Sequence, residues 1–172
     1  MNVVAERPGT AAMSLEAATA LRAEGRHDEA RAELVTLAAA HPHDALVQYE
    51  AACVHDFLGD EAAAVPYYVA AIAAGLPDEA LRGAYLGLGS TYRTLGRYAD
   101  ADAVLVAGRE RFPDARELAV FHAMVLHNLG RSKVAVEMLL TLLAQTSANP
   151  GIAAYRRAIT AYAEDIDRRW PG

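Results

Sequence analysis

The stretch LGLGSTYRTLGRYADA, residues 86–101, decides how this chain folds. Its apolar residues recur at helical spacing, yet glycine stands at positions 87, 89 and 96. A glycine inside a helix costs about 1 kcal/mol relative to alanine, so close packing must offset the loss. A fold in which two helices approach each other very closely would supply that gain.

Composition narrows the class of protein. The chain has 172 residues, enough for one domain with a real core. Hydrophobic residues make up 53% and alanine is the commonest, which indicates an all-helical fold. A net charge of −6 without any run of lysine and arginine argues against nucleic acid as a partner. The single cysteine, Cys53, permits no intrachain disulfide.

Targeting signals are not evident in the sequence. The N-terminal segment MNVVAERPGT lacks the basic and apolar regions of a signal peptide. No apolar run reaches the roughly 18 residues that a membrane span needs. These features predict a cytoplasmic protein without a membrane partner.

A glycine followed by a polar residue recurs along the chain, at Gly25, Gly59, Gly96 and Gly130. The intervals are 34, 37 and 34 residues, a period that indicates stacked supersecondary units. An alanine stands five positions after each glycine, and a large apolar residue stands nine positions after it. Each unit is therefore predicted to be a helix, a glycine-led turn and a second, antiparallel helix.

The glycines of residues 86–101 then have separate predicted roles. Gly89 is expected where the two helices of one hairpin approach most closely, since a side chain there would push them apart. Gly96 is expected to end the first helix in the left-handed conformation. Gly87 is expected off this contact, so that alanine would be tolerated there.

Residues 85–113 carry the most complete motif. The pattern of aromatic, leucine, glycine, alanine and proline positions is formed by Tyr85, Leu88, Gly89, Tyr92, Gly96, Tyr98, Ala101, Leu105 and Pro113. On these positions the chain resembles tetratricopeptide-repeat proteins, and its central part resembles a group of small bacterial members of unassigned activity. The resemblance implies an all-α fold, an α-solenoid of about four helix-turn-helix repeats, and dimers.

The predicted domain organisation follows from the repeats. Residues 1–10 are expected to be a disordered tail, four units to occupy about 11–43, 44–77, 78–115 and 116–149, and residues 150–172 to form a capping helix. The capping helix is predicted to begin after Asn149 and to present an apolar stripe to the stack. This stripe comprises Ile152, Tyr155, Ile159, Tyr162 and Ile166.

The second unit departs from the regular pattern. It carries three extra residues, which predict a first helix one turn longer in unit 3. It also carries Pro66 inside its second helix, which predicts a bend there.

Motifs for catalysis or cofactors are weak. GLGS at residues 87–90 lacks the lysine and the preceding strand of a phosphate loop. HPHD at residues 41–44 lacks a third metal ligand, and Asp44 is better explained as a helix cap. The sequence therefore predicts neither an enzyme nor a cofactor or metal site.

Three buried candidates have structural explanations. His55 and His122 fall in columns that pack between helices, so both are expected to be core histidines with satisfied nitrogens. Cys53 lies two residues from His55, a helical spacing that turns the two side chains to different faces. Cys53 is therefore expected to be a small hydrophobe that is buried or lines the groove.

The concave face of a repeat stack is lined by the first helix of every unit. Positions ten, six, three and two before each turn glycine give the predicted binding residues: Tyr49, Cys53, Asp56, Phe57, Leu86, Ser90, Arg93, Thr94, Val120, Met124, His127 and Asn128, with Leu15, Thr19, Arg22 and Ala23 from unit 1. Related domains clamp chaperone tails with lysines and asparagines, but the matching first-helix positions here hold Leu15, Thr19, Tyr49, Cys53, Leu86 and Ser90.

This lining predicts a non-catalytic scaffold that holds a peptide or protein segment in the concave groove. A self-associating homodimer is the alternative function, and a small-ligand sensor is a third. The identity of any partner is open at this point.

Asp56, Arg93 and His127 each stand three residues before a turn glycine and should form a column across successive helices. Neighbouring helix axes about 8–10 Å apart would let Asp56 and Arg93 form an ion pair. In the alternative interpretation Arg93 anchors a carboxylate or carbonyl group of a bound segment.

Overall fold

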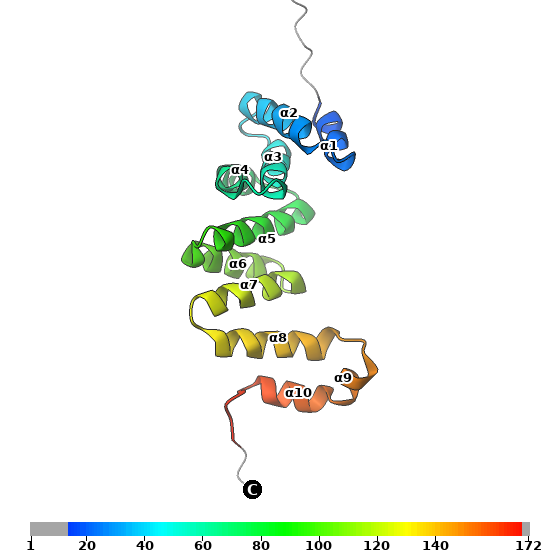
Figure 1. Cartoon of the computed structure of the whole chain (residues 1–172), viewed down its shortest axis with the longest axis vertical. Coiled ribbons are helices and arrows are strands. Elements are labelled where there is room, and N and C mark those ends of the chain that lie inside the picture. The colour runs from blue at the N-terminus through cyan, green and yellow to red at the C-terminus, as the bar shows by residue number, and fades with distance from the viewer. Residues whose placement is uncertain (1–13, 170–172) are drawn as a thin grey trace, which may run out of the picture.

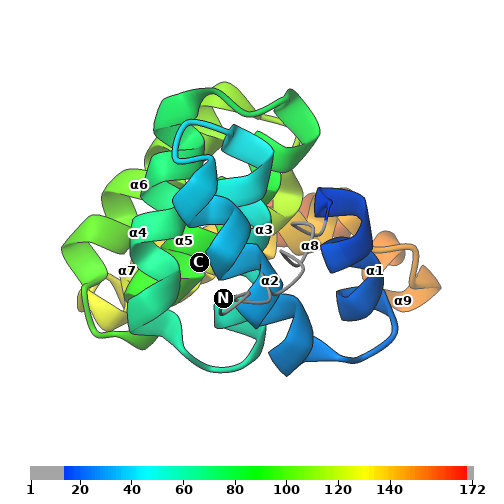
Figure 2. The ribbon, with the colours of Figure 1, turned by 90° about the horizontal axis from the view of Figure 1, so that it is seen from above.

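The computed structural model describes residues 14–169, which form ten α-helices and no strand. The helices are α1 (Leu15–Ala23), α2 (His27–Ala40), α3 (Ala45–Phe57), α4 (Glu61–Ala74), α5 (Asp78–Thr94), α6 (Tyr98–Arg111), α7 (Arg116–Asn128), α8 (Ser132–Thr146), α9 (Pro150–Ala154) and α10 (Arg156–Ala163). They follow one another along the long axis of the molecule as an α-solenoid (Figure 1). Seen along that axis, successive helices cross at an angle (Figure 2).

The four turn glycines all have positive φ, between 73° and 80°. The residue after each glycine donates its backbone N–H to the carbonyl oxygen five residues earlier, and the four bonds are Arg26 to Leu21, Asp60 to His55, Arg97 to Tyr92 and Arg131 to Leu126, at 2.8–2.9 Å. This Schellman arrangement satisfies carbonyl groups at the helix end. The prediction for Gly96 is confirmed, and the first helices α1, α3, α5 and α7 end in the same way.

Gly89 lies at the contact between α5 and α6, as predicted. A Cβ atom at this position would lie 2.5 Å from Cγ of Leu105, whose side chain is fully buried. Gly87 lies off this contact, as predicted, but the expectation that alanine would be tolerated there is wrong, because a Cβ atom would lie 2.4 Å from the hydroxyl oxygen of Tyr68 on α4. α5 packs against the preceding hairpin as well as its own partner helix, so it has two crowded faces.

Unit 3 begins with the longest first helix. α5 has 17 residues, whereas α3 and α7 have 13 each, so the predicted extra turn is confirmed. α4 runs without interruption through Pro66. The bend at this proline stays a prediction.

Local caps occur where they were predicted. The Asp44 carboxylate accepts hydrogen bonds from the backbone N–H groups of Leu46 and Val47 and begins α3. The Asn149 side chain accepts from Gly151 and Ile152 and begins α9.

The two core histidines differ in their hydrogen bonds. His122 is buried, and both of its ring nitrogens have partners, Arg109 and Asp102. His55 is also buried and its Nδ1 contacts Asp60, but its Nε2 has no hydrogen-bond partner. The prediction of satisfied nitrogens therefore holds for His122 and is wrong for Nε2 of His55.

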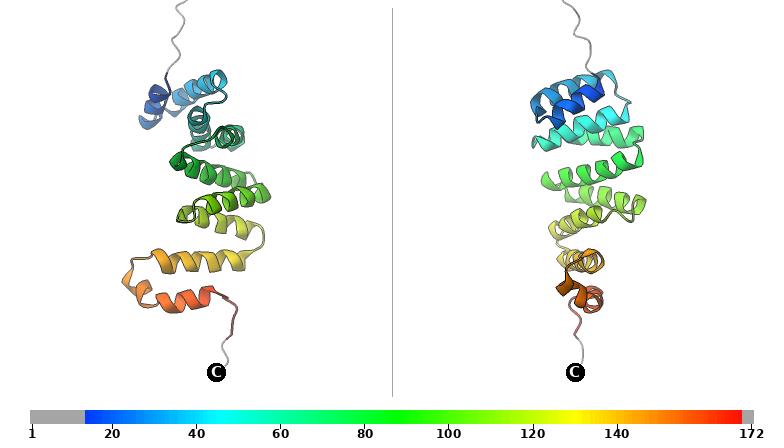
Figure 3. Two further views of the ribbon diagram at one scale, coloured as in Figure 1. Left: turned by 180° about the vertical axis from the view of Figure 1, so that it is seen from behind. Right: turned by 90° about the vertical axis from the view of Figure 1, so that its right-hand side faces the viewer.

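The C-terminal segment differs from the single amphipathic helix that was expected. It forms two helices, α9 and α10, which meet at Tyr155, and α10 packs against α8 (Figure 3). The side chains of Tyr155 and Tyr162 are 69% and 55% exposed, so their predicted place in the covered stripe is wrong. Arg156 instead turns toward α8 and donates to the carbonyl oxygen of Ala144 at 2.8 Å. The end of α8 needs such donors, and this bond connects α10 to α8.

The predicted tail of residues 1–10 and the last three residues of the predicted capping helix, 170–172, lie outside the described residues. Within residues 14–169, no helix is long and apolar enough to cross a membrane.

Candidate interaction surfaces

A pocket of about 620 Å³ opens between α1 and α3, and we call it the N-terminal pocket. Its lining residues are Thr19, Arg22, Ala23, His27, Cys53, Asp56, Phe57 and Tyr68. All but two of them come from the predicted first-helix positions. His27 and Tyr68 were missed because they belong to second helices, although Tyr68 stands in the repeating column of large apolar residues.

Phe57 forms an exposed aromatic edge of this pocket. It ends α3, its side chain is 67% exposed, and its ring centroid lies 4.0 Å from that of His27. Nδ1 of His27 is buried and has no hydrogen-bond partner. The pocket therefore presents a large apolar ring beside an unpartnered polar atom.

Asp56 joins three helices beneath this aromatic edge. Its two carboxylate oxygens accept hydrogen bonds from the hydroxyl of Tyr68 on α4 and from that of Thr91 on α5, each at 3.1 Å. The expected ion pair between Asp56 and Arg93 is not formed, since Nε of Arg93 donates to Asn128 at 3.0 Å. Thr91, which lies two positions before Arg93, is the residue of α5 that bonds to Asp56.

Three further polar groups of the N-terminal pocket are neutral or paired. Burial raises the pKa of the Cys53 thiol, so this side chain is neutral at neutral pH. Burial also raises the pKa of Tyr68, which keeps its hydroxyl as a hydrogen-bond donor to Asp56. Arg22 forms an ion pair with Glu50 at 2.7 Å. These groups suit recognition by hydrogen bonds and apolar contact better than nucleophilic chemistry.

A smaller pocket of about 290 Å³ lies between α5, α7 and α8. Its lining residues are Arg93, Ala123, Met124, His127, Ser132, Ala135, Val136 and Leu139. The first-helix positions Arg93, Met124 and His127 thus come together here, away from those of the N-terminal pocket.

The other predicted binding residues line neither of these two pockets. They are Tyr49, Leu86, Ser90, Thr94, Val120 and Asn128, together with Leu15 of unit 1. The Tyr49 hydroxyl faces Gly83 of α5, and Leu86 packs against the central core. Thr94 is exposed, Leu15, Ser90 and Val120 are half-buried, and Asn128 holds Arg93.

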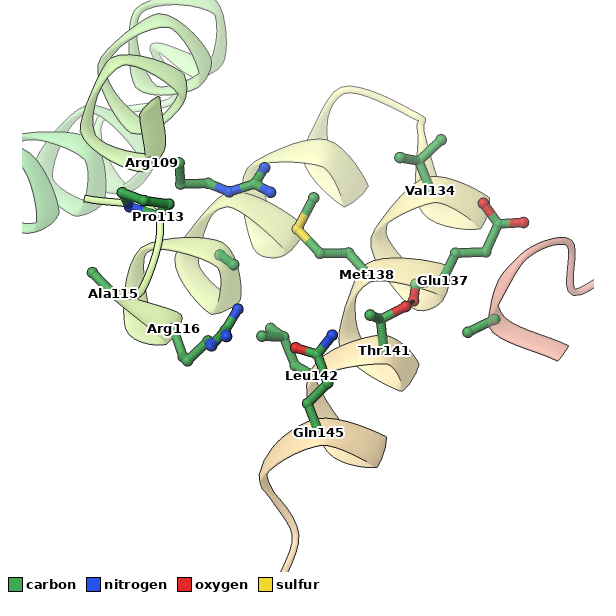
Figure 4. Close-up of a pocket in the computed structure, with 12 residues that line it drawn as sticks. Arg109, Pro113, Ala115, Arg116, Val134, Glu137, Met138, Thr141, Leu142 and Gln145 are labelled. Atoms are coloured by element: carbon green, nitrogen blue, oxygen red, sulfur yellow. Dashed lines mark hydrogen bonds between the residues drawn. The ribbon is translucent and has the colours of Figure 1, made fainter. Parts of the chain in front are cut away.

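A third cavity, of about 470 Å³, was not anticipated from the sequence, and we call it the α7–α8 pocket (Figure 4). It is lined by Arg109, Pro113, Ala115, Arg116, Ala119, Val134, Glu137, Met138, Thr141, Leu142, Gln145 and Ala163. These side chains come from α6, α7, α8, α10 and the segment between α6 and α7. Those on α8 recur at helical spacing along the sequence, but their combination with side chains of α6, α7 and α10 depends on packing between hairpins, so the repeat pattern did not identify the group.

Metal-binding clusters are absent from the part of the chain that the structure describes. No three histidine, cysteine, aspartate or glutamate side chains there are placed to hold a metal ion.

The fold defines the class of protein, an α-solenoid of helical hairpins in which each hairpin has a glycine-led Schellman turn. The family profile described as Tetratrico peptide repeat matches residues 45–166. The chain therefore belongs to the tetratricopeptide-repeat family, whose repeats are generally protein-interaction modules and typically non-catalytic. No curated protein matches the chain.

Proposed function

We propose that this protein is a non-catalytic scaffold that holds a peptide or protein segment in the groove formed by its first helices, with the N-terminal pocket as the anchor. The observation that carries the proposal is Phe57, 67% exposed at the edge of a pocket of about 620 Å³. A large exposed aromatic beside a pocket is the kind of surface on which a partner side chain packs and contributes strongly to affinity.

The polar groups indicate which segment would fit. Arg22 is neutralised by Glu50, whereas Asp56 is held by two neutral hydroxyl groups. A carboxylate can accept about four hydrogen bonds, so Asp56 retains capacity for further donors. A segment with an apolar side chain for Phe57 and an amide or basic group for Asp56 matches this pocket.

The test compares Phe57→Ala with Val106→Ala, a control on the second helix α6 that also truncates an exposed apolar residue. Each protein is immobilised in equal amount, exposed to native lysate, and its captured proteins are quantified by mass spectrometry. We expect a specific set of proteins on the wild type and Val106→Ala, reduced at least tenfold on Phe57→Ala with little change in melting temperature. An unchanged set on Phe57→Ala would contradict the proposed anchor.

Self-association is a second candidate function, favoured by a different observation. Tyr155 and Tyr162 are exposed on the C-terminal helices and line a cavity of about 460 Å³ with small alanine side chains. A second copy could pack against these rings. Light scattering at several concentrations tests this function. A constant dimer mass that becomes monomeric in a Tyr155→Ser, Tyr162→Ser variant supports it, and a monomeric wild type contradicts it.

A further inference from the structure

The α7–α8 pocket combines an apolar floor with two arginine side chains. Ala115, Ala119, Met138, Leu142 and Ala163 supply apolar surface. Figure 4 shows Arg109 and Arg116 extending toward α8, with Met138 and Leu142 reaching toward them from that helix. The volume of about 470 Å³ falls within the usual range of small-molecule sites.

Arg109 is held in place by a partly buried hydrogen-bonded chain through the buried ring of His122. Its Nη1 atom lies 2.8 Å from Nδ1 of His122, and Nε2 of His122 lies 2.7 Å from Oδ1 of Asp102. Arginine can only donate, so Nδ1 of His122 accepts and the proton of the ring is on Nε2, which donates to Asp102. The chain fixes the guanidinium group and uses one of its five N–H donors.

Arg116 supplies a second positive charge on the same pocket. It is exposed at the start of α7 and has no hydrogen-bond or ion-pair partner among residues 14–169. The one acidic lining residue, Glu137, is engaged elsewhere, with its Oε1 accepting from the backbone N–H of Ile166 at 3.2 Å and lying 3.8 Å from Nζ of Lys133. Arg116 therefore presents an unpaired positive charge beside the apolar side chains of the pocket.

We propose that the α7–α8 pocket binds a small organic monocarboxylate with an apolar tail. The planar guanidinium groups match a carboxylate, which accepts two parallel hydrogen bonds from one arginine. The tail lies against Met138 and Leu142. This site is separate from the N-terminal pocket and does not depend on the function proposed for it.

The test is calorimetric titration of the full-length protein with decanoate below its micelle-forming concentration. Acetate lacks the tail, 1-decanol lacks the charge, and decyltrimethylammonium reverses the charge. We expect saturable one-to-one binding of decanoate, at least tenfold tighter than each of these three compounds and weakened by added salt. Equal binding of decanoate and 1-decanol, or no saturable binding of decanoate, would overturn the proposal.

Two arginine variants test whether decanoate binds in the α7–α8 pocket. Arg116→Ala removes an exposed side chain without a partner, so it should leave the melting temperature unchanged and weaken decanoate binding at least tenfold. Arg131→Ala removes an exposed arginine outside the pocket and should leave the affinity unchanged. Equal affinities of the two variants for decanoate would show that the acid binds outside the α7–α8 pocket. Tighter binding of the peptide acetyl-Ala-Ala-Leu, through its free carboxylate, would show that a peptide C-terminus is the occupant and overturn the small-acid assignment.

Discussion

Two glycines of α5, separated by one residue, contact different helices. Gly87 faces Tyr68 of α4, and Gly89 faces Leu105 of α6. Two residues correspond to roughly 200° around a helix, so the two positions lie on nearly opposite sides. α5 is thus held between two neighbours, and each contact needs a residue without a side chain.

Gly87→Ala should consequently destabilise the protein. The added methyl group would meet the buried Tyr68 ring, whose hydroxyl is bonded to Asp56 and cannot move away freely. Overpacking of this kind costs about 1–3 kcal/mol, more than the gain of about 1 kcal/mol in helix propensity. Urea unfolding measures the effect, with Ser90→Ala on the same helix as a control. A variant more stable than the wild type would contradict the packing described for Tyr68.

Gly83 permits a sharper test, because a single oxygen atom crowds it. A Cβ atom there would lie 2.3 Å from the hydroxyl oxygen of Tyr49 but 3.3 Å from its Cζ. Gly83→Ala should destabilise the wild type by about 1 kcal/mol and be neutral or stabilising in a Tyr49→Phe background, which regains helix propensity. A double-mutant cycle by urea unfolding measures the coupling between the two positions. Purely additive effects would show that the hydroxyl is not the obstacle.

At the scale of the element, the first helix of each unit ends at a glycine-led turn, whereas α8 ends in a different way. α1, α3, α5 and α7 share the same glycine-led hydrogen bond. α8 ends at Thr146 without such a glycine, and the side chain of Arg156 donates to the carbonyl groups of Ala144 and Ser147. α8 is therefore capped by a side chain from the segment that packs against it.

Arg156→Ala and Arg157→Ala form a matched pair that tests this cap. Both side chains are exposed on the same helix, but only Arg156 donates to the end of α8. We expect Arg156→Ala to lower the free energy of unfolding by about 1 kcal/mol and Arg157→Ala to leave it within about 0.5 kcal/mol of the wild type. Thermal melts followed by circular dichroism provide the comparison. Equal losses in the two variants would mean that the hydrogen bonds do not stabilise α8.

At the scale of the whole molecule, the buried side chains of residues 14–169 form three clusters along the stack. The central cluster extends from Ala52 to Val125, and a second one lies in the first two units. The third cluster comprises Ala123, Leu126 and Ala135, with Met138 packed against it. Because repeats contact mainly their neighbours, we expect local stability to be highest where the buried clusters are largest.

Amide hydrogen exchange should therefore vary along the chain. We expect the slowest exchange in α5 and α6, which lie in the central cluster, and the fastest among the described helices in α9 and α10. Exchange measured by mass spectrometry at peptide resolution gives the profile. Uniform protection from α1 to α10 would show that the stack opens as one cooperative unit.

The hairpin architecture could be read from particular residues. Gly25, Gly59, Gly96 and Gly130 mark the helix ends because a positive φ is a local requirement that glycine meets. Asp44 and Asn149 could be identified as caps for the same reason, since each acts on N–H groups two or three residues away. Helical periodicity and turn formation depend on residues only a few positions apart. The helices, turns and caps could therefore be predicted from the sequence.

Contacts between hairpins were decided by the tertiary structure. Asp56 pairs with Tyr68 and Thr91 in place of Arg93, and the α7–α8 pocket gathers side chains from four helices, α6, α7, α8 and α10. Such partners depend on the angle at which one hairpin rests on the next and on the rotation of each helix about its own axis. Both the angle and the rotation are set by the packing of buried side chains that lie far apart in the chain. The sequence pattern therefore determines which segments form helices, and the packed core determines which helix faces contact one another.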